Sequence, residues 1–135
     1  MMNNKNILLR QKVFEYVDKE YNSKIEYLWM RYPSYAVFRN NESKKWYGIV
    51  MDISYKKLGI DKDGIVDILN VKVNDFLLKD FLIDQKGIFN GYHIAKGNWI
   101  SILLDGTVEI NKIFELIDES YNIVSKKRSV KKWNQ

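Results

Sequence analysis

Apolar residues recur with helical spacing at both ends of the chain and with strand spacing between them, and this order limits the fold strongly. Near the C-terminus an i, i+3, i+4 pattern predicts a helix over about residues 108–125. A similar stripe predicts a helix over about residues 6–21. Each helix has one apolar face, so each needs a layer to pack against. The two stripes consist of Ile110, Ile113, Phe114, Ile117, Tyr121 and Val124, and of Leu9, Val13, Tyr16 and Val17.

The region between these helices is typical of short strands joined by turns. Apolar alternation and β-branched residues predict strands at 35–39, 46–54, 65–73 and 99–104, with an extended piece at 88–94. In the strand at 46–54 the alternation places Gly48 opposite the apolar face, where a glycine indicates a bulge or a close backbone approach. The residues predicted to share that apolar face are Tyr47, Ile49, Met51 and Ile53.

A further helix is predicted within residues 74–84, between the third strand and Gly87. Asn74 is expected to cap it, because its side chain can accept a hydrogen bond from a free backbone N–H group. The apolar stripe of this helix consists of Leu77, Leu78, Phe81 and Leu82.

The resulting order is helix, three strands, helix, two strands and helix. Short antiparallel strands with helices at the ends predict the α+β class, as a two-layer α/β sandwich in which helices cover one face of a sheet. The length of 135 residues suffices for one buried core. We therefore expect a single domain over residues 1–125, followed by a basic tail over residues 126–135.

Positive charge is concentrated in this tail, which reads KKRSVKKWNQ and contains five basic residues and no acid. The whole chain has 22 basic and 17 acidic residues, so the part before the tail is neutral. A basic tail attracts phosphate backbones or acidic surfaces without reading sequence. The alternative interpretation is a solvated terminus that keeps the protein in solution.

The absence of cysteine excludes disulfides and thiolate metal sites, and it permits an intracellular location. The N-terminal segment lacks the apolar core of a signal peptide. No stretch approaches the roughly 20 apolar residues of a membrane span. We expect a cytoplasmic protein that does not enter a membrane.

The residue types disfavour enzymatic and metal chemistry. His93 is the single histidine and no cysteine accompanies it, so no metal site is predicted. Ser101 alternates with core residues in a strand, and no acid is placed by sequence to orient His93 as a base. Glycine motifs for phosphate or dinucleotide binding are absent. We expect no catalytic residue and no cofactor, and we interpret His93 as a hydrogen-bonded brace of its turn.

The segment GYHIAKGNW at residues 91–99 resembles the most recognisable motif of the MmcQ/YjbR family. Residues 32–53 and 66–72 are similar to the family's hairpin and third strand, so the resemblance covers most of residues 30–125. It implies an α-β3-α-β2-α sandwich with a mostly antiparallel five-stranded sheet, similar to secretion chaperones. It also implies a DNA-binding protein with two wing-like hairpins. The motif is matched by Gly91, Tyr92, His93, Lys96 and Trp99, with departures at Ile94, Ala95 and Asn98.

Basic and aromatic residues at two turns and in the tail lead to the hypothesis of a small non-enzymatic protein that binds duplex DNA weakly. Cations would contact phosphate, while the aromatic residues would shape the contact surface. Two observations oppose it: the body is neutral, and Trp46 and Trp99 begin strands, which is typical of core aromatics. The candidate residues are Lys44, Lys45, Tyr92, His93, Lys96, Trp99, Lys126, Lys127 and Arg128.

A protein-interaction module is the competing hypothesis. A sheet like that of secretion chaperones can bind a partner segment through an exposed face or edge. Tyrosine and tryptophan are enriched at such interfaces as well. DNA binding would weaken steeply with salt, whereas association with a protein would not, so salt dependence separates the two.

Overall fold

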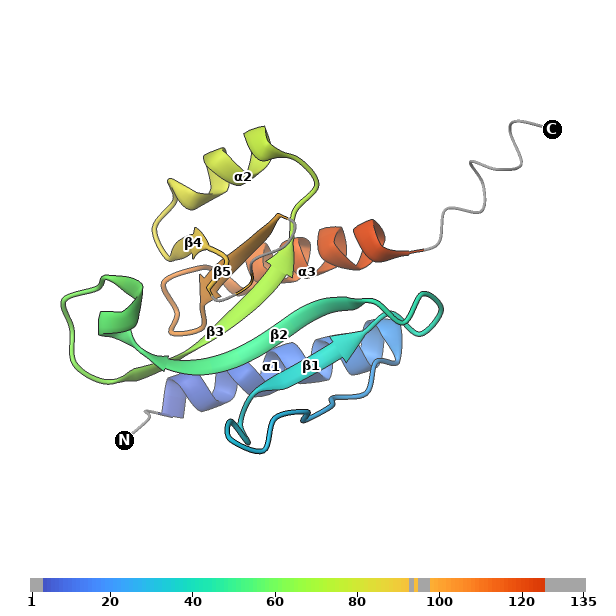
Figure 1. The fold of residues 1–135 in the computed structure, drawn as a ribbon, viewed down its shortest axis with the longest axis horizontal. Coiled ribbons are helices and arrows are strands. Elements are labelled where there is room, and N and C mark those ends of the chain that lie inside the picture. Colours follow the sequence, from blue (N-terminus) through green and yellow to red (C-terminus); the bar gives the residue numbers. More distant parts are fainter. Residues whose placement is uncertain (1–3, 93, 95–97, 126–135) are drawn as a thin grey trace.

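The computed structural model of the protein describes residues 4–92, 94 and 98–125 (Figure 1). The predicted order of elements is confirmed, and most helix and strand ends lie within two residues of the predicted ones. Of the predicted extended piece at 88–94, residues 88–90 form a strand, whereas the described residues Gly91, Tyr92 and Ile94 do not. The elements are α1 (Asn4–Tyr21), β1 (Ala36–Arg39), β2 (Trp46–Ser54), the 3-10 helix η1 (Tyr55–Leu58), β3 (Ile65–Lys72), α2 (Phe76–Ile83), β4 (Ile88–Asn90), β5 (Trp99–Leu103) and α3 (Ile110–Val124).

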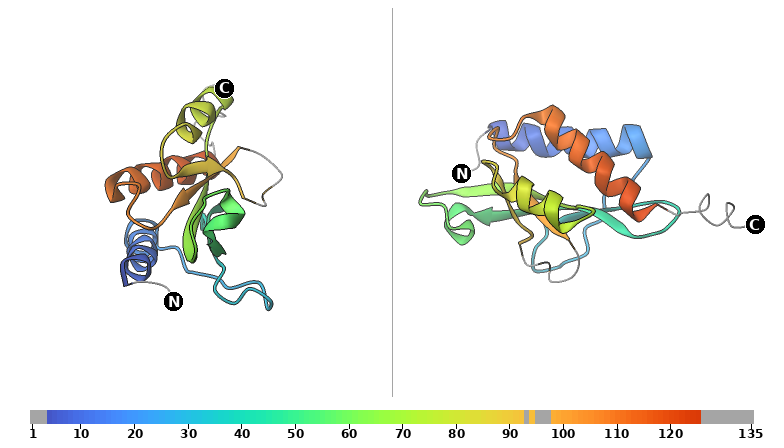
Figure 2. Two further views of the ribbon diagram at one scale, coloured as in Figure 1. Left: turned by 90° about the vertical axis from the view of Figure 1, so that its left-hand side faces the viewer. Right: turned by 90° about the horizontal axis from the view of Figure 1, so that it is seen from above.

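The strands form one antiparallel five-stranded sheet in the order β1-β2-β3-β5-β4. Helices α1 and α3 cover one face of this sheet, which we call the helix face (Figure 2). The opposite face is covered by the segment between α1 and β1, by η1 and by the segment after β4, and we call it the loop face. The α+β sandwich predicted from the order of elements is therefore confirmed.

The core of the helix face forms because both terminal helices direct their predicted stripes onto the sheet. Val13 and Val17 of α1 and Ile113 and Ile117 of α3 are completely buried there. They pack against strand residues that point to the same side, such as Leu69 of β3. Burial of such side chains is worth about 1.5–3 kcal/mol each, so these contacts supply much of the stability.

A buried ion pair fixes α1 on this face. Asp67 of β3 is fully buried, and the Arg10 guanidinium donates to both of its carboxylate oxygens, at 3.0 and 2.9 Å. A third bond, of 2.8 Å, joins Arg10 to the carbonyl of Ser34 in the segment that leads to β1. The two-point geometry holds the helix, the sheet and the preceding segment in one arrangement.

The bulge predicted at Gly48 is confirmed, but the predicted face of Tyr47 is wrong. Phe38 of β1 pairs with Gly48, whereas the next residue pairs with Trp46, so Tyr47 is an extra residue in β2. The bulge turns Tyr47 into the helix-face core, while Ile49 remains on the loop face. Glycine is required beside it, because a Cβ at Gly48 would lie 1.8 Å from the Phe38 ring.

The loop face contains a second buried cluster, which the sequence did not indicate. Tyr55, Val66 and Ile68 are among its buried members, and Trp29 and Tyr35 pack over it from the segment before β1. The sheet is therefore apolar on both sides, and irregular segments cover the side that the helices leave open.

Helix α2 differs from its prediction in its cap and in its stripe. Asp75 caps it in place of Asn74, and the Asp75 carboxylate accepts from the Leu78 N–H at 2.8 Å. Of the predicted stripe, Leu82 is buried in the helix-face core, whereas Leu77 and Phe81 are 83% and 64% exposed. The helix lies beside β4 at the edge of the sheet, so only one side of it reaches the core.

Candidate nucleic-acid interface

The turn between β1 and β2 presents two lysines to solvent. The Asn40 side chain is buried, and its oxygen accepts from the N–H groups of Glu42 and Ser43 at 2.8 and 3.0 Å. The chain then passes through a left-handed conformation at Lys44, where φ is 65°. This closed turn leaves Lys44 and Lys45 exposed at its tip.

The same turn is bound to the C-terminal ends of both long helices. The Asn41 side chain donates to the carbonyls of Tyr21 and Asn22 at the end of α1, at 3.2 and 3.1 Å. The Asn40 side chain donates to the Ser125 hydroxyl, which directly follows α3, at 3.1 Å. Ser125, the last described residue before the tail, therefore lies beside the β1–β2 turn.

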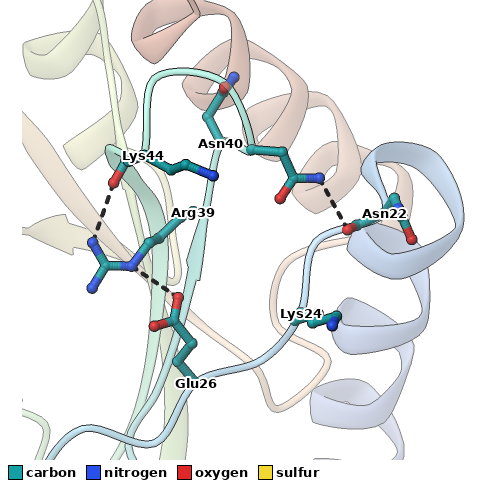
Figure 3. Close-up of a pocket in the computed structure, with 7 residues that line it drawn as sticks. Asn22, Lys24, Glu26, Arg39, Asn40 and Lys44 are labelled. Atoms are coloured by element: carbon teal, nitrogen blue, oxygen red, sulfur yellow. Dashed lines mark hydrogen bonds and ion pairs between the residues drawn. The ribbon is translucent and has the colours of Figure 1, made fainter.

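A cavity of about 380 Å³ lies between this turn and the segment after α1 (Figure 3). Its lining includes three cations, Lys24, Arg39 and Lys44, and one acid, Glu26. The Arg39 Nε donates to a Glu26 carboxylate oxygen at 2.8 Å, and the Arg39 guanidinium also donates to the Lys44 carbonyl at 3.2 Å. Arg39 is thus neutralised by Glu26, and the two lysines are the cations left to attract an anion.

A further lysine lies near Lys45 on the neighbouring strand. The ammonium of Lys72 lies 5.5 Å from the centroid of the Trp99 ring, and these two residues are paired across β3 and β5. Burial, with a smaller repulsion from Lys45, lowers the pKa of Lys72 below its ordinary value. Trp99 itself is 5% exposed, so little of its ring surface is available for stacking with a nucleic-acid base. In the structure this ring contacts the Lys72 ammonium. We call Lys24, Arg39, Lys44, Lys45 and Lys72 together the hairpin end.

The structure places Tyr92 on the loop face, where it lines a different cavity from Lys24 and Lys44. The Tyr92 N–H donates to the Ser101 hydroxyl at 2.9 Å. Ser101 in turn donates to the side chain of Asn70, which donates to the Ile49 carbonyl at 3.2 Å. Together with the backbone bond of 3.0 Å from the Gly91 N–H to the Trp99 carbonyl, this chain of hydrogen bonds holds the start of the 91–99 segment on the sheet. The candidate residues His93, Lys96, Lys126, Lys127 and Arg128 lie outside the described residues.

Sequence reasoning missed three members of the hairpin end, Lys24, Arg39 and Lys72. Each is separated from the β1–β2 turn by other elements or is hidden within a strand pattern, so no local motif marks it. The sequence offers one partial signal for Lys72. It lies near the end of a predicted strand, and a lysine at the end of a strand can extend its ammonium into water.

Taken together, the fold and the site define an α+β sandwich with a basic hairpin end. A protein-family model described as YjbR matches residues 11–123, and the chain therefore belongs to the YjbR family. The resemblance deduced from the 91–99 segment is confirmed. In the described part of the chain, no helix combines the length and apolar character that crossing a membrane requires.

Relatives and solved structures agree with this assignment. The uncharacterised protein YyaQ of Bacillus subtilis is 38% identical over 117 residues, which cover 87% of this chain and 98% of YyaQ. A crystal structure of a Pseudomonas syringae protein superposes with a TM-score of 0.81 at 36% identity, covering 92% of this chain and all of that one. A Deinococcus radiodurans protein shares the fold, with a TM-score of 0.65 at 24% identity, and covers 87% of this chain and 79% of its own.

Proposed function

We propose that the protein is non-enzymatic and binds duplex DNA weakly, without reading sequence, through the hairpin end and the adjoining basic tail. The supporting observation is the Asn40–Ser125 hydrogen bond, because it joins the last described residue before the tail to the turn that exposes Lys44 and Lys45. The neutral composition of the body opposed DNA binding when charge was counted over the chain. The two exposed lysines at this turn support the proposal, because they give a local positive charge that a count over the whole body does not reveal.

The contacts in this proposal are to phosphate and not to base edges. Lysines attract the backbone as point charges, which positions a protein without specifying sequence. The buried Trp99 ring, which leaves little surface for stacking with a base, favours the same interpretation. Binding should therefore depend steeply on salt, because each neutralised phosphate releases a counterion.

The test is a fluorescence anisotropy titration of a labelled duplex of about 20 base pairs, repeated at several KCl concentrations. The Lys44→Gln/Lys45→Gln variant should bind severalfold more weakly, and its slope of log K against log salt should fall by about 1 for each lost contact. A matched control is Lys56→Gln/Lys86→Gln, which removes two exposed lysines far from the hairpin end.

Deletion of residues 126–135 should weaken binding further than the double substitution, because the tail contains five basic residues. The proposal is wrong if binding is insensitive to salt, or if the control variant loses as much affinity as the hairpin variant. Circular dichroism of each variant establishes that the fold is retained.

A second candidate function, a protein-interaction module, is favoured by the outer side of α2. Phe76, Leu77 and Phe81 are 73%, 83% and 64% exposed, which is unusual for large apolar side chains on one short helix. Asp80 and Asp84 lie on the same exposed side, so charge complementarity calls for a partner that combines apolar and basic side chains. We propose a basic amphipathic helix as this partner.

A synthetic leucine- and lysine-containing amphipathic peptide is the probe for this surface. Its binding should be lost in Leu77→Glu and Phe81→Glu, and kept in the hairpin variant Lys44→Gln/Lys45→Gln. Equal binding by all variants would overturn the assignment. Self-association of the unmodified protein in sedimentation, lost in the same two α2 variants, would instead identify a second copy as the partner and would also contradict the peptide proposal.

A further inference from the structure

A cavity of about 590 Å³ lies along the edge of β2, beyond the last residue that pairs with β1, and it is distinct from the cavity at the hairpin end. It is bounded by residues 31–35, by the C-terminal half of β2, by the start of β3 and by Tyr92. Its volume falls in the range of about 300–1,000 Å³ typical of sites for small molecules. It is also larger than the cavity of about 380 Å³ at the hairpin end.

The floor of this cavity is apolar and its wall is aromatic. Met51 and Ile53 lie on the floor and are almost completely buried, whereas Ile65 is 54% exposed and stands at the opening. Tyr32 and Tyr35 are stacked in the wall, with ring centroids 4.7 Å apart and planes inclined by 14°. Flat aromatic side chains beside an apolar floor favour a planar ring over a flexible chain, because rings stack at a low entropic cost.

Hydroxyl groups converge on one side of the cavity. Burial raises the pKa of Tyr35, and the neighbouring Asp52, Tyr32 and Tyr92 raise it further, so the Tyr35 hydroxyl stays protonated and can donate a hydrogen bond. The Asp52 carboxylate already accepts a hydrogen bond from the Ser34 hydroxyl. Tyr92 is held at this position by its bond to Ser101, so the wall is formed before any ligand arrives.

Two cations in the lining give the cavity a positive balance. Arg31 and Lys57 both line it, and Asp52 is its single carboxylate. Within the described residues neither cation is within ion-pair distance of a carboxylate, whereas the adjacent Lys56 pairs with Asp63 at 3.1 Å. Of the two adjacent lysines in η1, Lys56 is paired with a carboxylate of the described residues and Lys57 is not. Lys57 is therefore available to bind an anion.

We propose that this cavity binds a small planar aromatic molecule that carries an anionic group. The ring lies against the tyrosine wall and over the apolar floor, and the anion lies between Arg31 and Lys57 at the opening. The hydroxyl of Tyr35 donates a hydrogen bond to a polar atom of the ligand. This site is separate from the hairpin end, and its occupancy does not require DNA.

Three probes with the same ring test the proposal by calorimetric titration: 2-naphthoate, 2-naphthyl phosphate and the neutral 2-naphthylmethanol. The anions should bind saturably with one site per chain, and the tighter of the two identifies a carboxylate or a phosphate as the preferred group. Arg31→Gln and Lys57→Gln should each weaken anion binding roughly fivefold and leave the alcohol unchanged.

Lys56→Gln is the matched control, because it removes the neighbouring charge without altering the lining. Ile65→Trp should block all three probes by filling the opening, and because Ile65 is exposed the fold should tolerate it. The proposal is overturned if no probe binds saturably, if the alcohol binds as tightly as the anions, or if Lys56→Gln weakens binding as much as Lys57→Gln.

Discussion

The two faces of the sheet are both buried, but they are closed in different ways. On the helix face, two regular helices pack their apolar stripes against the strands and leave a continuous core. On the loop face, irregular segments contribute aromatic side chains such as Trp29 and Tyr35, and a cavity lies beside Tyr35 at the edge of β2. Regular packing therefore provides a continuous core on one side, while the irregular covering of the other side borders a cavity.

The buried polar groups of the two faces show the same division. On the helix face, Ser120 donates to the Tyr47 carbonyl at 2.7 Å and accepts from the Lys72 N–H at 2.9 Å, which satisfies backbone groups beside the bulge. On the loop face, Ser101 holds the Tyr92 N–H, which belongs to a segment outside the strands. One serine completes the sheet, whereas the other positions a wall of the cavity.

The largest expected effect belongs to the helix face. Asp67→Ala should lower the free energy of unfolding by about 3–5 kcal/mol, because the Arg10 charge would remain buried without its partner. Urea denaturation measures this loss. The exposed Lys56–Asp63 pair serves as the comparison, because Lys56→Gln should lower the free energy of unfolding by at most about 1 kcal/mol. Similar losses in both variants would contradict the importance given to the buried pair.

The paired substitutions Ser101→Ala and Ser120→Ala compare the two faces directly. Both serines are completely buried, and each removal leaves polar groups without a partner, so each should cost about 1–3 kcal/mol. Amide hydrogen exchange should then separate them, because Ser101→Ala accelerates exchange at Tyr92 and Ser120→Ala does so at Lys72. If both variants accelerate exchange at the same amides, the two serines do not act on separate faces of the sheet.

The smallest effect is expected where the loop face meets the turn after β5. Tyr55 donates to the Asp105 carboxylate at 2.7 Å, so Tyr55→Phe should cost about 1 kcal/mol near neutral pH. Burial alone would raise the pKa of Asp105, but hydrogen bonds from Thr107 and Tyr55 outweigh it and lower that pKa below its ordinary value of 3.8.

This lowered pKa makes the cost of Tyr55→Phe depend on pH. The contribution of the carboxylate to stability is fully present above pH 3.8 and is lost as the pH falls through the lower pKa of the folded state. The difference in unfolding free energy between the protein and the variant should therefore shrink in acid. Urea denaturation at a series of pH values measures it, and a constant difference would show that the Tyr55–Asp105 bond is not its source.

Much of the fold was predictable because its signals are local. The spacing of Val13 and Val17, or of Ile113 and Ile117, indicates an amphipathic helix whatever the rest of the chain does. The face of Tyr47 was not predictable, because strand alternation assumes a regular strand and the bulge appears only when β1 pairs with β2. The exposure of Leu77 was equally hidden, since a stripe does not reveal whether another layer covers it.

The candidate sites were predictable only in part. Lys44 and Lys45 were found because a polar turn between two strands is visible in the sequence, and Tyr92 was found through a family motif. The structure places Tyr92 in the lining of a different cavity, and it adds Lys72 and Lys24 to the lysines of the turn. These groupings depend on strand order and on the path of irregular segments, which periodicity does not encode.

The sequence by itself determined the order of the elements, the family and the position of the excess positive charge, because all three follow from short stretches of residues. Tertiary structure alone decided that Ser125 lies beside the β1–β2 turn and that residues 31–35, β2, β3 and Tyr92 line a cavity. The physical reason is that both arrangements join residues distant in the chain, and such contacts form only when the whole sheet and its covering segments pack together.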